Sequence, residues 1–71
     1  MKFIKTNNEI ISLENVLKVS LREFGTGAKS NPLQCYIDIY YTNCQETRLD
    51  CGNTRERQAE LFEKIATILA N

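Results

Sequence analysis

The spacing of the apolar residues changes once along this chain, near Gly52, and that change limits the folds open to it. Before Gly52, apolar and polar residues alternate, which is the pattern of a strand with one buried face. After it, apolar residues recur every three or four positions, as in an amphipathic helix. The two apolar surfaces can cover each other, so the sequence predicts an α+β domain with a small antiparallel sheet of about four to five strands and one C-terminal amphipathic helix packed on one face.

The strands are expected in order along residues 2–51. The β-prone pieces Lys2–Lys5 and Glu9–Ser12 flank a polar turn and favour a small hairpin. The next strand carries alternating apolar residues and ends near Phe24; its predicted core face is Leu17, Val19 and Leu21. Gly25–Leu33 contains two glycines and a proline and is expected to form a mobile loop.

The turn between the last two strands can be predicted from their register. A two-residue turn would place Ile37 opposite Asp50 and divide the apolar residues between both faces. A three-residue turn of Thr42–Cys44 instead pairs Ile37 with Leu49, at the cost of a left-handed conformation at its last residue. We therefore expect the three-residue turn.

The helix is expected over Arg55–Ala70. Its predicted apolar stripe comprises Phe62, Ile65, Ile68 and Leu69, with Leu61 and Ala66 at the margins. Asn53 is the expected N-cap, with Glu56 three residues later as in a capping box. Glu60 and Lys64 have the spacing of a favourable ion pair on one helix face.

Composition excludes several classes of protein. The 71 residues suffice for a single domain, residues 1–71. Nine basic and nine acidic residues balance, which disfavours nucleic acid as a partner. No segment has the pattern of a signal peptide or a bilayer span, so no membrane association is expected. Three cysteines, an odd number, favour reduced thiols and a cytoplasmic location.

The cysteines are expected to serve as small apolar residues. In the predicted register Cys35 faces Cys51, near enough for a strained disulfide, but burial as free thiols is the favoured interpretation. A zinc site would need four ligands, whereas the chain has widely spaced cysteines and no histidine. We expect no metal and no cofactor.

Catalytic motifs are also weak. The segment GTGAKS, residues 25–30, departs from a phosphate-binding loop by an extra Ala28 and by a following proline where a helix should begin. Without histidine the chain lacks the commonest general base. The protein is therefore not expected to be an enzyme.

Two surfaces remain as candidate sites. The first is the outer side of the sheet, where tyrosine and arginine, both enriched in binding hot spots, are expected together; the candidate residues are Phe24, Tyr36, Asp38, Tyr40 and Arg48. An ordinary solvated face with an Asp38–Arg48 pair is the alternative. This surface predicts a small non-enzymatic module that binds a protein partner.

The second surface is the helix start. Arg55 and Arg57 lie in a first turn where the helix dipole prefers anions. Neutralisation by Asp50, Glu56 or Glu14 is the simpler interpretation, and an anion or nucleic-acid site built from Thr54, Arg55 and Arg57 is the alternative.

Tyr36–Leu69 resembles known sequences in its pattern of Y-x-I-x-I-x-Y, an Asn-containing turn, C-G-N and a final E-L-F-x-K-I helix. It is similar to short uncharacterised bacterial and phage-type proteins, and loosely to the last strands and closing helix of pleckstrin-homology-like domains. The resemblance implies no functional residues. A protein of this size can also act as an inhibitor encoded by a mobile element, and its thin core and exposed sheet edge favour a homodimer.

Overall fold

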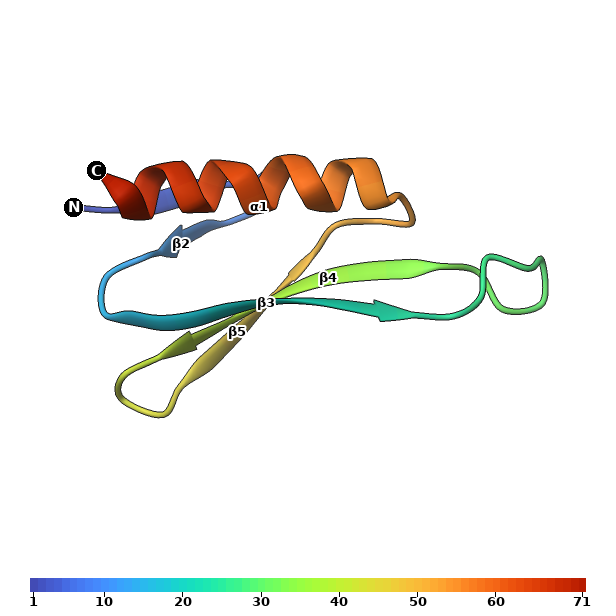
Figure 1. Cartoon of the computed structure of the whole chain (residues 1–71), viewed down its shortest axis with the longest axis horizontal. Coiled ribbons are helices and arrows are strands. Elements are labelled where there is room, and N and C mark those ends of the chain that lie inside the picture. Colours follow the sequence, from blue (N-terminus) through green and yellow to red (C-terminus); the bar gives the residue numbers. More distant parts are fainter.

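The computed structural model describes all 71 residues and confirms the α+β fold (Figure 1). Five strands precede one C-terminal helix: β1 (Phe3–Lys5), β2 (Ile10–Ser12), β3 (Val16–Phe24), β4 (Gln34–Tyr41), β5 (Glu46–Asp50) and α1 (Arg55–Ala70). The strands form two antiparallel sheets: a β1–β2 hairpin and a three-stranded sheet in the order β3-β4-β5. The chain bends between them at Asn15, which has a φ of 61°.

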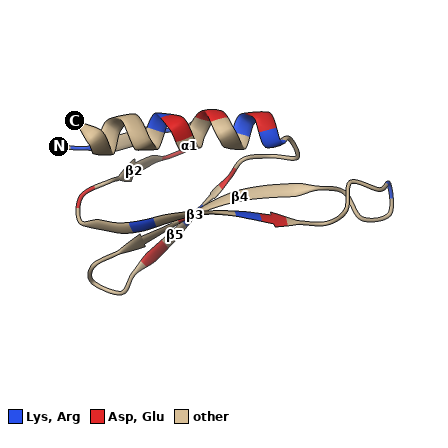
Figure 2. Cartoon of the chain, viewed as in Figure 1, with Lys and Arg blue, Asp and Glu red and all other residues tan.

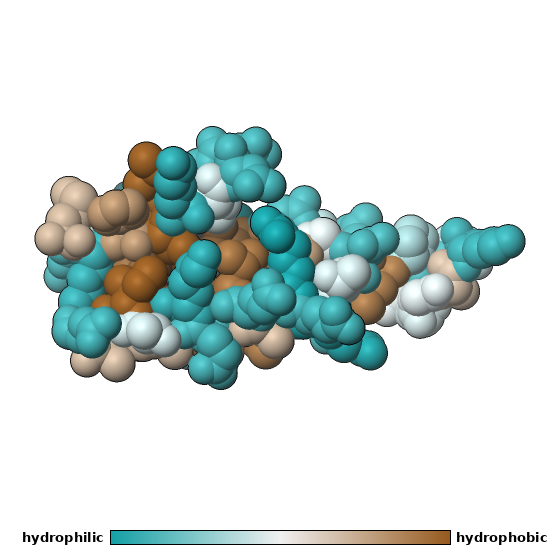
Figure 3. All heavy atoms as spheres, turned by 90° about the horizontal axis from the view of Figure 1, so that it is seen from above, coloured by the Kyte–Doolittle hydropathy of each residue, from teal (hydrophilic) through white to brown (hydrophobic).

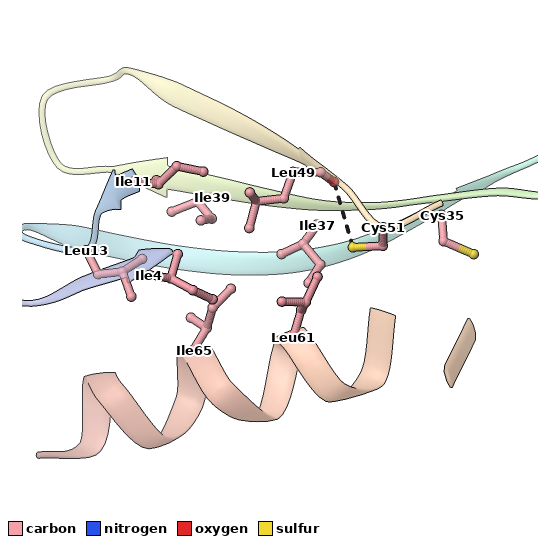
Figure 4. Packing of buried hydrophobic residues seen from close by; sticks show 10 residues of the cluster. All are labelled: Ile4, Ile11, Leu13, Cys35, Ile37, Ile39, Leu49, Cys51, Leu61 and Ile65. Atoms are coloured by element: carbon pink, nitrogen blue, oxygen red, sulfur yellow. Dashed lines mark hydrogen bonds between the residues drawn. The ribbon is translucent and has the colours of Figure 1, made fainter. Parts of the chain in front are cut away.

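The core lies between β4 and a cover made of α1 and the β1–β2 hairpin (Figure 4). It consists of ten buried residues: Ile4, Ile11, Leu13, Cys35, Ile37, Ile39, Leu49, Cys51, Leu61 and Ile65. Alternation along β4 sends Cys35, Ile37 and Ile39 inward, all fully buried. The helix packs mainly on β4 and β1 and reaches β3 only through polar contacts near the end of that strand, so Leu21 of β3 stays half exposed.

Cys35 and Cys51 serve as buried apolar residues in this core. Both are free thiols with no exposed surface, and their sulfur atoms point in different directions (Figure 4). The Cys51 thiol donates a long hydrogen bond to the Leu49 carbonyl, at 3.8 Å. Burial and the neighbouring Cys35 raise the pKa of Cys51, which opposes formation of the reactive thiolate.

The predicted β4–β5 register is correct. Ile37 pairs with Leu49, and the strands are joined by a loop of residues 42–44 closed by the Tyr41 N–H, which donates to the Gln45 carbonyl at 2.9 Å. Cys44 ends the loop with a φ of 68°, the expected left-handed conformation. Asn43 stabilises the loop because its side-chain oxygen accepts from the Gln45 N–H.

The prediction that Leu17 lies on the core face is wrong, because β3 has a bulge at this residue. Val16 pairs with Tyr41 but Lys18 with Tyr40, so Leu17 is an extra residue without a partner and 71% of its surface is exposed. Val19 still lies on the inner side of the sheet. The sequence pattern predicted regular alternation and therefore placed Leu17 wrongly in the core.

The helix begins with a different cap from the one predicted. Thr54, rather than Asn53, is the N-cap, and its hydroxyl accepts from the Arg57 N–H. The predicted apolar stripe does face the core, with Leu61 and Ile65 buried and Phe62, Ile68 and Leu69 packed against them. The differences are that Gln58 is also buried and that Ala66 is exposed. The predicted Glu60–Lys64 ion pair does not form.

Gln58 is the buried polar residue of this stripe. Its side-chain amide donates to the Arg22 carbonyl at 3.2 Å and to the Tyr36 carbonyl at 2.9 Å, thereby joining α1 to both β3 and β4. No buried side-chain polar atom in the structure lacks a hydrogen-bond partner. The helix is thus held to the sheet by a specific polar contact as well as by apolar packing.

The β3–β4 hairpin extends beyond the start of α1 as an arm (Figures 1 and 3). It makes the molecule elongated, 41 × 22 × 21 Å, with a radius of gyration of 12.8 Å, whereas a compact domain of this length has about 11 Å. The Thr26 and Gly27 N–H groups both donate to the Asn31 carbonyl and close the loop at the tip. Gly25 has a φ of 88°, and a Cβ atom there would lie 2.2 Å from the Pro32 carbonyl oxygen, so only glycine fits.

Candidate functional site: the outer face of the sheet

The side of the three-stranded sheet that faces away from α1 is called the outer face. Alternation places ten residues on it: Lys18, Ser20, Arg22 and Phe24 of β3, Tyr36, Asp38 and Tyr40 of β4, and Glu46, Arg48 and Asp50 of β5. The predicted cross-strand neighbours are confirmed, including Asp38 opposite Arg48. All five residues proposed for partner binding therefore share this face.

Asp38 is the centre of an ion-pair network on the outer face. The Arg22 Nε atom donates to one carboxylate oxygen at 2.6 Å, and the Arg48 Nε atom donates to the other at 2.9 Å. The two arginines cover the carboxylate so well that Asp38 is only 4% exposed, while their own side chains stay about half exposed, at 45% and 50%. Asp38 therefore positions the arginines rather than meeting solvent itself.

The hydrogen bonds of this network stabilise the ionised form of Asp38. Burial alone would raise the pKa of Asp38, but the hydrogen bonds and charges of Arg48 and Arg22 outweigh burial and lower it. Asp38, and secondarily Tyr40, raise the pKa of Arg22. The network thus stays ionised at neutral pH. The sequence predicted the pairing of Asp38 with Arg48 but not its ion pair with Arg22.

Arg48 also contacts two aromatic rings. Its guanidinium carbon lies 5.6 Å from the centre of the Phe24 ring and 5.3 Å from that of Tyr36, within cation–π range. The two rings meet edge to face, with centroids 5.6 Å apart and an interplanar angle of 70°. These three residues, Phe24, Tyr36 and Arg48, form what is called here the Arg48 cluster.

Tyr40 lies apart from this cluster. The Lys18 Nζ atom is 4.7 Å from the centre of its ring. Next to it, Asp38, Glu46, Thr47 and Arg48 line an open polar hollow of about 370 Å³ with no apolar wall. The outer face therefore has an aromatic part around Arg48 and a polar part towards the β4–β5 turn.

The helix start is arranged differently from the prediction. Arg55 forms a bidentate contact with Glu23 of β3, at 3.0 and 3.3 Å, and Glu23 was not among its expected partners. The contact raises the pKa of Arg55. Thr54 uses its hydroxyl as the helix cap. Arg55 and Thr54 are thus already engaged within the chain.

Arg57 lies on another side of the helix and has no ion pair. It lines an open hollow of about 370 Å³ together with Lys5, Thr6, Asn7, Glu60, Leu61 and Lys64. Figure 2 shows Lys and Arg interleaved with Asp and Glu along α1, so the surrounding surface carries both signs of charge. Of the residues predicted for an anion site, only Arg57 borders a hollow.

Other kinds of site find less support in the structure. No three His, Cys, Asp or Glu side chains gather closely enough to hold a metal ion. Cys44 is the single exposed thiol, and it lies alone in the β4–β5 turn. The helix lacks the length and apolar character needed to cross a membrane.

Comparison with protein-family models, with curated proteins and with solved structures finds no match for this chain. The likeness of Tyr36–Leu69 to bacterial and phage-type proteins and to pleckstrin-homology-like domains therefore remains a prediction.

Proposed function

We propose that this protein is a small, non-enzymatic protein-binding module that acts through its outer face, as a homodimer. The observation that carries the proposal is the Arg48 cluster: an arginine fixed by a buried carboxylate and laid over two aromatic rings on a face that the helix leaves uncovered. Arginine and tyrosine supply much of the binding energy in protein interfaces.

The cluster is organised before any partner arrives. Asp38 holds the Arg48 Nε atom, and the rings limit where its guanidinium can lie. An arginine normally loses about 0.5–1.5 kcal/mol of side-chain freedom when an interface immobilises it. Because that freedom is already restricted, a larger share of the contact energy remains for binding. Phe24, 45% exposed, adds apolar area beside the charge.

The charge of the outer face favours a protein over a nucleic acid. Lys18, Arg22 and Arg48 are balanced by Asp38, Glu46 and Asp50, so the face has no basic excess to attract phosphates. Its charged groups of both signs and its aromatic rings suit a partner surface of mixed character.

The test is quantitative capture of partners from nuclease-treated lysate with the wild type and a Phe24→Ser, Tyr36→Ser double variant. The matched control is Phe3→Ser, Ile10→Ser, which removes two exposed apolar side chains from the β1–β2 hairpin, 46% and 69% exposed in the wild type. A partner lost with the first variant and kept with the control supports the proposal, and the pair is then measured with purified proteins.

Equal recovery of every partner by the wild type and the outer-face variant contradicts the proposal. Once a partner is purified, its activity in the complex separates an inhibitor from an adaptor. An inhibitor, such as mobile elements encode, lowers that activity through the same outer-face residues.

A second candidate function is anion binding beside Arg57. The supporting observation is that Arg57, Lys5 and Lys64 border one hollow and none forms an ion pair. We expect an anionic probe to bind the wild type more tightly than the Arg57→Gln variant. The probes are inorganic phosphate and a short oligonucleotide. Arg55→Gln is the matched control because Glu23 already occupies that side chain. Equal affinity for all three proteins excludes this site.

A further inference from the structure

One long edge of the three-stranded sheet has no partner. β3 is nine residues long, pairs only with β4, and leaves its other side free. An unpaired edge of this length presents a row of backbone donors and acceptors to any strand that fits it.

The backbone groups that face this free edge can be identified from the hydrogen bonds of β4. Cys35 and Tyr41 direct theirs to the β5 side: the Tyr41 N–H donates to Gln45, and Cys35 exchanges bonds with Cys51 and Gly52. Because bonding directions alternate along a strand, the even-numbered residues of β4 bond to β3. Their partners on β3 are the even-numbered residues, so the free edge presents the N–H and C=O groups of Val19, Leu21 and Glu23.

The free edge is apolar at its midpoint. Leu21 lies on the inner side of the sheet opposite Ile37, yet half of its surface, 50%, is exposed because the helix packs on β4 and β1 instead. Ile37 on the neighbouring strand is fully buried. The apolar layer of the sheet is therefore complete over β4 and open over β3.

The bulge at Leu17 limits which part of β3 can pair with another strand. A bulge interrupts regular pairing, so the usable stretch is Lys18–Phe24. Its midpoint is Leu21, whose backbone groups point to the free edge. Two copies of this stretch placed antiparallel about Leu21 overlap along their whole length.

The charges on β3 favour the same register. Centred on Leu21, the pairing sets Lys18 opposite Phe24 of the second copy and Ser20 opposite Arg22. Centred on Ser20, it would oppose Lys18 and Arg22, two like charges. Centred on Arg22 or Glu23, it would oppose that charge with itself. Like charges directly opposite across strands destabilise the pairing.

The geometry points to a homodimer in which two copies pair antiparallel along β3, with Leu21 facing Leu21 on the two-fold axis. Val19, Leu21 and Glu23 of each copy exchange about six backbone hydrogen bonds with the other copy. The two apolar leucines contact each other where each was half exposed. Lys18 of one copy lies beside the Phe24 ring of the other.

Such a dimer is closed rather than open-ended. A two-fold interface uses the same edge of both copies, so no free β3 edge remains. The opposite edge is β5, which has only five residues, two acidic and one basic, and such short, charged edges resist further pairing. The result is a continuous six-stranded sheet in which the two outer faces adjoin.

This inference rests on the homodimer part of the proposed function and gives it an interface, whereas partner binding through the outer face can fail separately. The outer face is tested by partner capture with Phe24 and Tyr36 variants, whereas the edge is tested by self-association of the purified chain with no partner present.

The experiment is sedimentation velocity on reduced protein from about 1 μM to about 1 mM, a range that covers dissociation constants from micromolar to millimolar. We expect the wild type to pass from monomer to dimer. Leu21→Lys and Leu21→Glu should each weaken the dimer at least tenfold, because each sets like charges against each other across the two-fold axis. An equimolar mixture of the two variants should restore it, since Lys then faces Glu.

The matched control is Leu17→Lys, the same substitution on the same strand at a more exposed position, 71%, outside the regular stretch. It should dimerise like the wild type. If the wild type stays monomeric over the whole concentration range, the proposal is overturned. The β3 edge would then be available only to a strand of another protein. A dimer that Leu21→Lys and Leu17→Lys weaken equally, or a mixture that stays monomeric, overturns the β3 interface centred on Leu21.

Discussion

The two sides of β4 differ more than any other two surfaces of this protein. Cys35, Ile37 and Ile39 point inward and are fully buried under α1 and the β1–β2 hairpin. Between them, Tyr36 and Asp38 point outward into a network of aromatic and charged groups. One eight-residue strand thus carries both the core and the proposed binding surface, and period-two alternation keeps them separate.

The difference between the two sides indicates which residues stabilise the fold and which remain available to bind a partner. The inner side excludes water, so stability depends on its volume and shape. The outer side is half exposed, so its contacts stabilise the fold less but remain available to a partner. Substitutions on neighbouring residues of β4 should therefore separate stability from binding.

The largest effect is expected from Ile37→Ala on the inner side. Ile37 has no exposed surface, and its truncation should lower the free energy of unfolding by about 2–5 kcal/mol through lost burial and a residual cavity. Urea unfolding followed by circular dichroism measures it. A loss below about 1 kcal/mol would mean that the inner side is loosely packed and that the contrast between the two sides is false.

Asp38→Asn should have the next largest effect, although it lies on the outer side. It leaves Arg22 and Arg48 without their common carboxylate, and we expect a loss of about 1–2 kcal/mol because both arginines can still reach water. The matched control is Asp50→Asn, on the same face but without an ion pair, which should be near neutral. Equal losses for the two variants would contradict the central position of Asp38.

The contribution of the Asp38 ion pairs to the free energy of unfolding should also depend on pH. The pKa of Asp38 is lowered in the folded protein, so the unfolded chain takes up its proton first as the pH falls. Its contribution is complete above the unfolded pKa, about 3.9, and is lost as the pH falls through the lower folded value. The stability gap between wild type and Asp38→Asn should be constant at neutral pH and should shrink below about pH 4. A gap that is unchanged at about pH 2 would exclude this linkage.

The smallest stability effect is expected from Tyr36→Ser. The substitution removes one edge-to-face contact, one cation–π contact and one exposed hydrogen bond to Gln34, for a loss of about 0.5–1 kcal/mol on this partly exposed surface. The same variant should lose at least about tenfold in affinity for a captured partner, measured by calorimetry. A large stability loss with unchanged affinity would reverse the assignment of the two sides.

Local patterns in the sequence account for much of this arrangement. The three-residue turn fixes the β4–β5 register, and with it the opposition of Asp38 and Arg48. Arg22 was missed as a partner because a nine-residue loop separates β3 from β4, and a loop of that length does not determine register. The bulge at Leu17 has no local signature, since Leu17 itself continues the alternation.

The other contacts that the sequence did not predict join segments far apart in the chain. Glu23 and Arg55 are 32 residues apart and meet only after β3 and α1 have docked. The burial of Gln58 could have been predicted from the sequence, because its spacing with Leu61 and Ile65 fits the buried face of the helix. Its polarity excluded it from an apolar pattern, although a buried amide with two acceptors is compatible with a core.

Gln58 also has a consequence for the order in which the chain folds. Its two acceptors, the Arg22 and Tyr36 carbonyls, come together only when β3 and β4 have paired. A helix that docked earlier would bury the Gln58 amide without partners, which costs about 1–3 kcal/mol. The hairpin should therefore form first and the helix dock afterwards, so that Gln58→Ala speeds unfolding while leaving the refolding rate nearly unchanged.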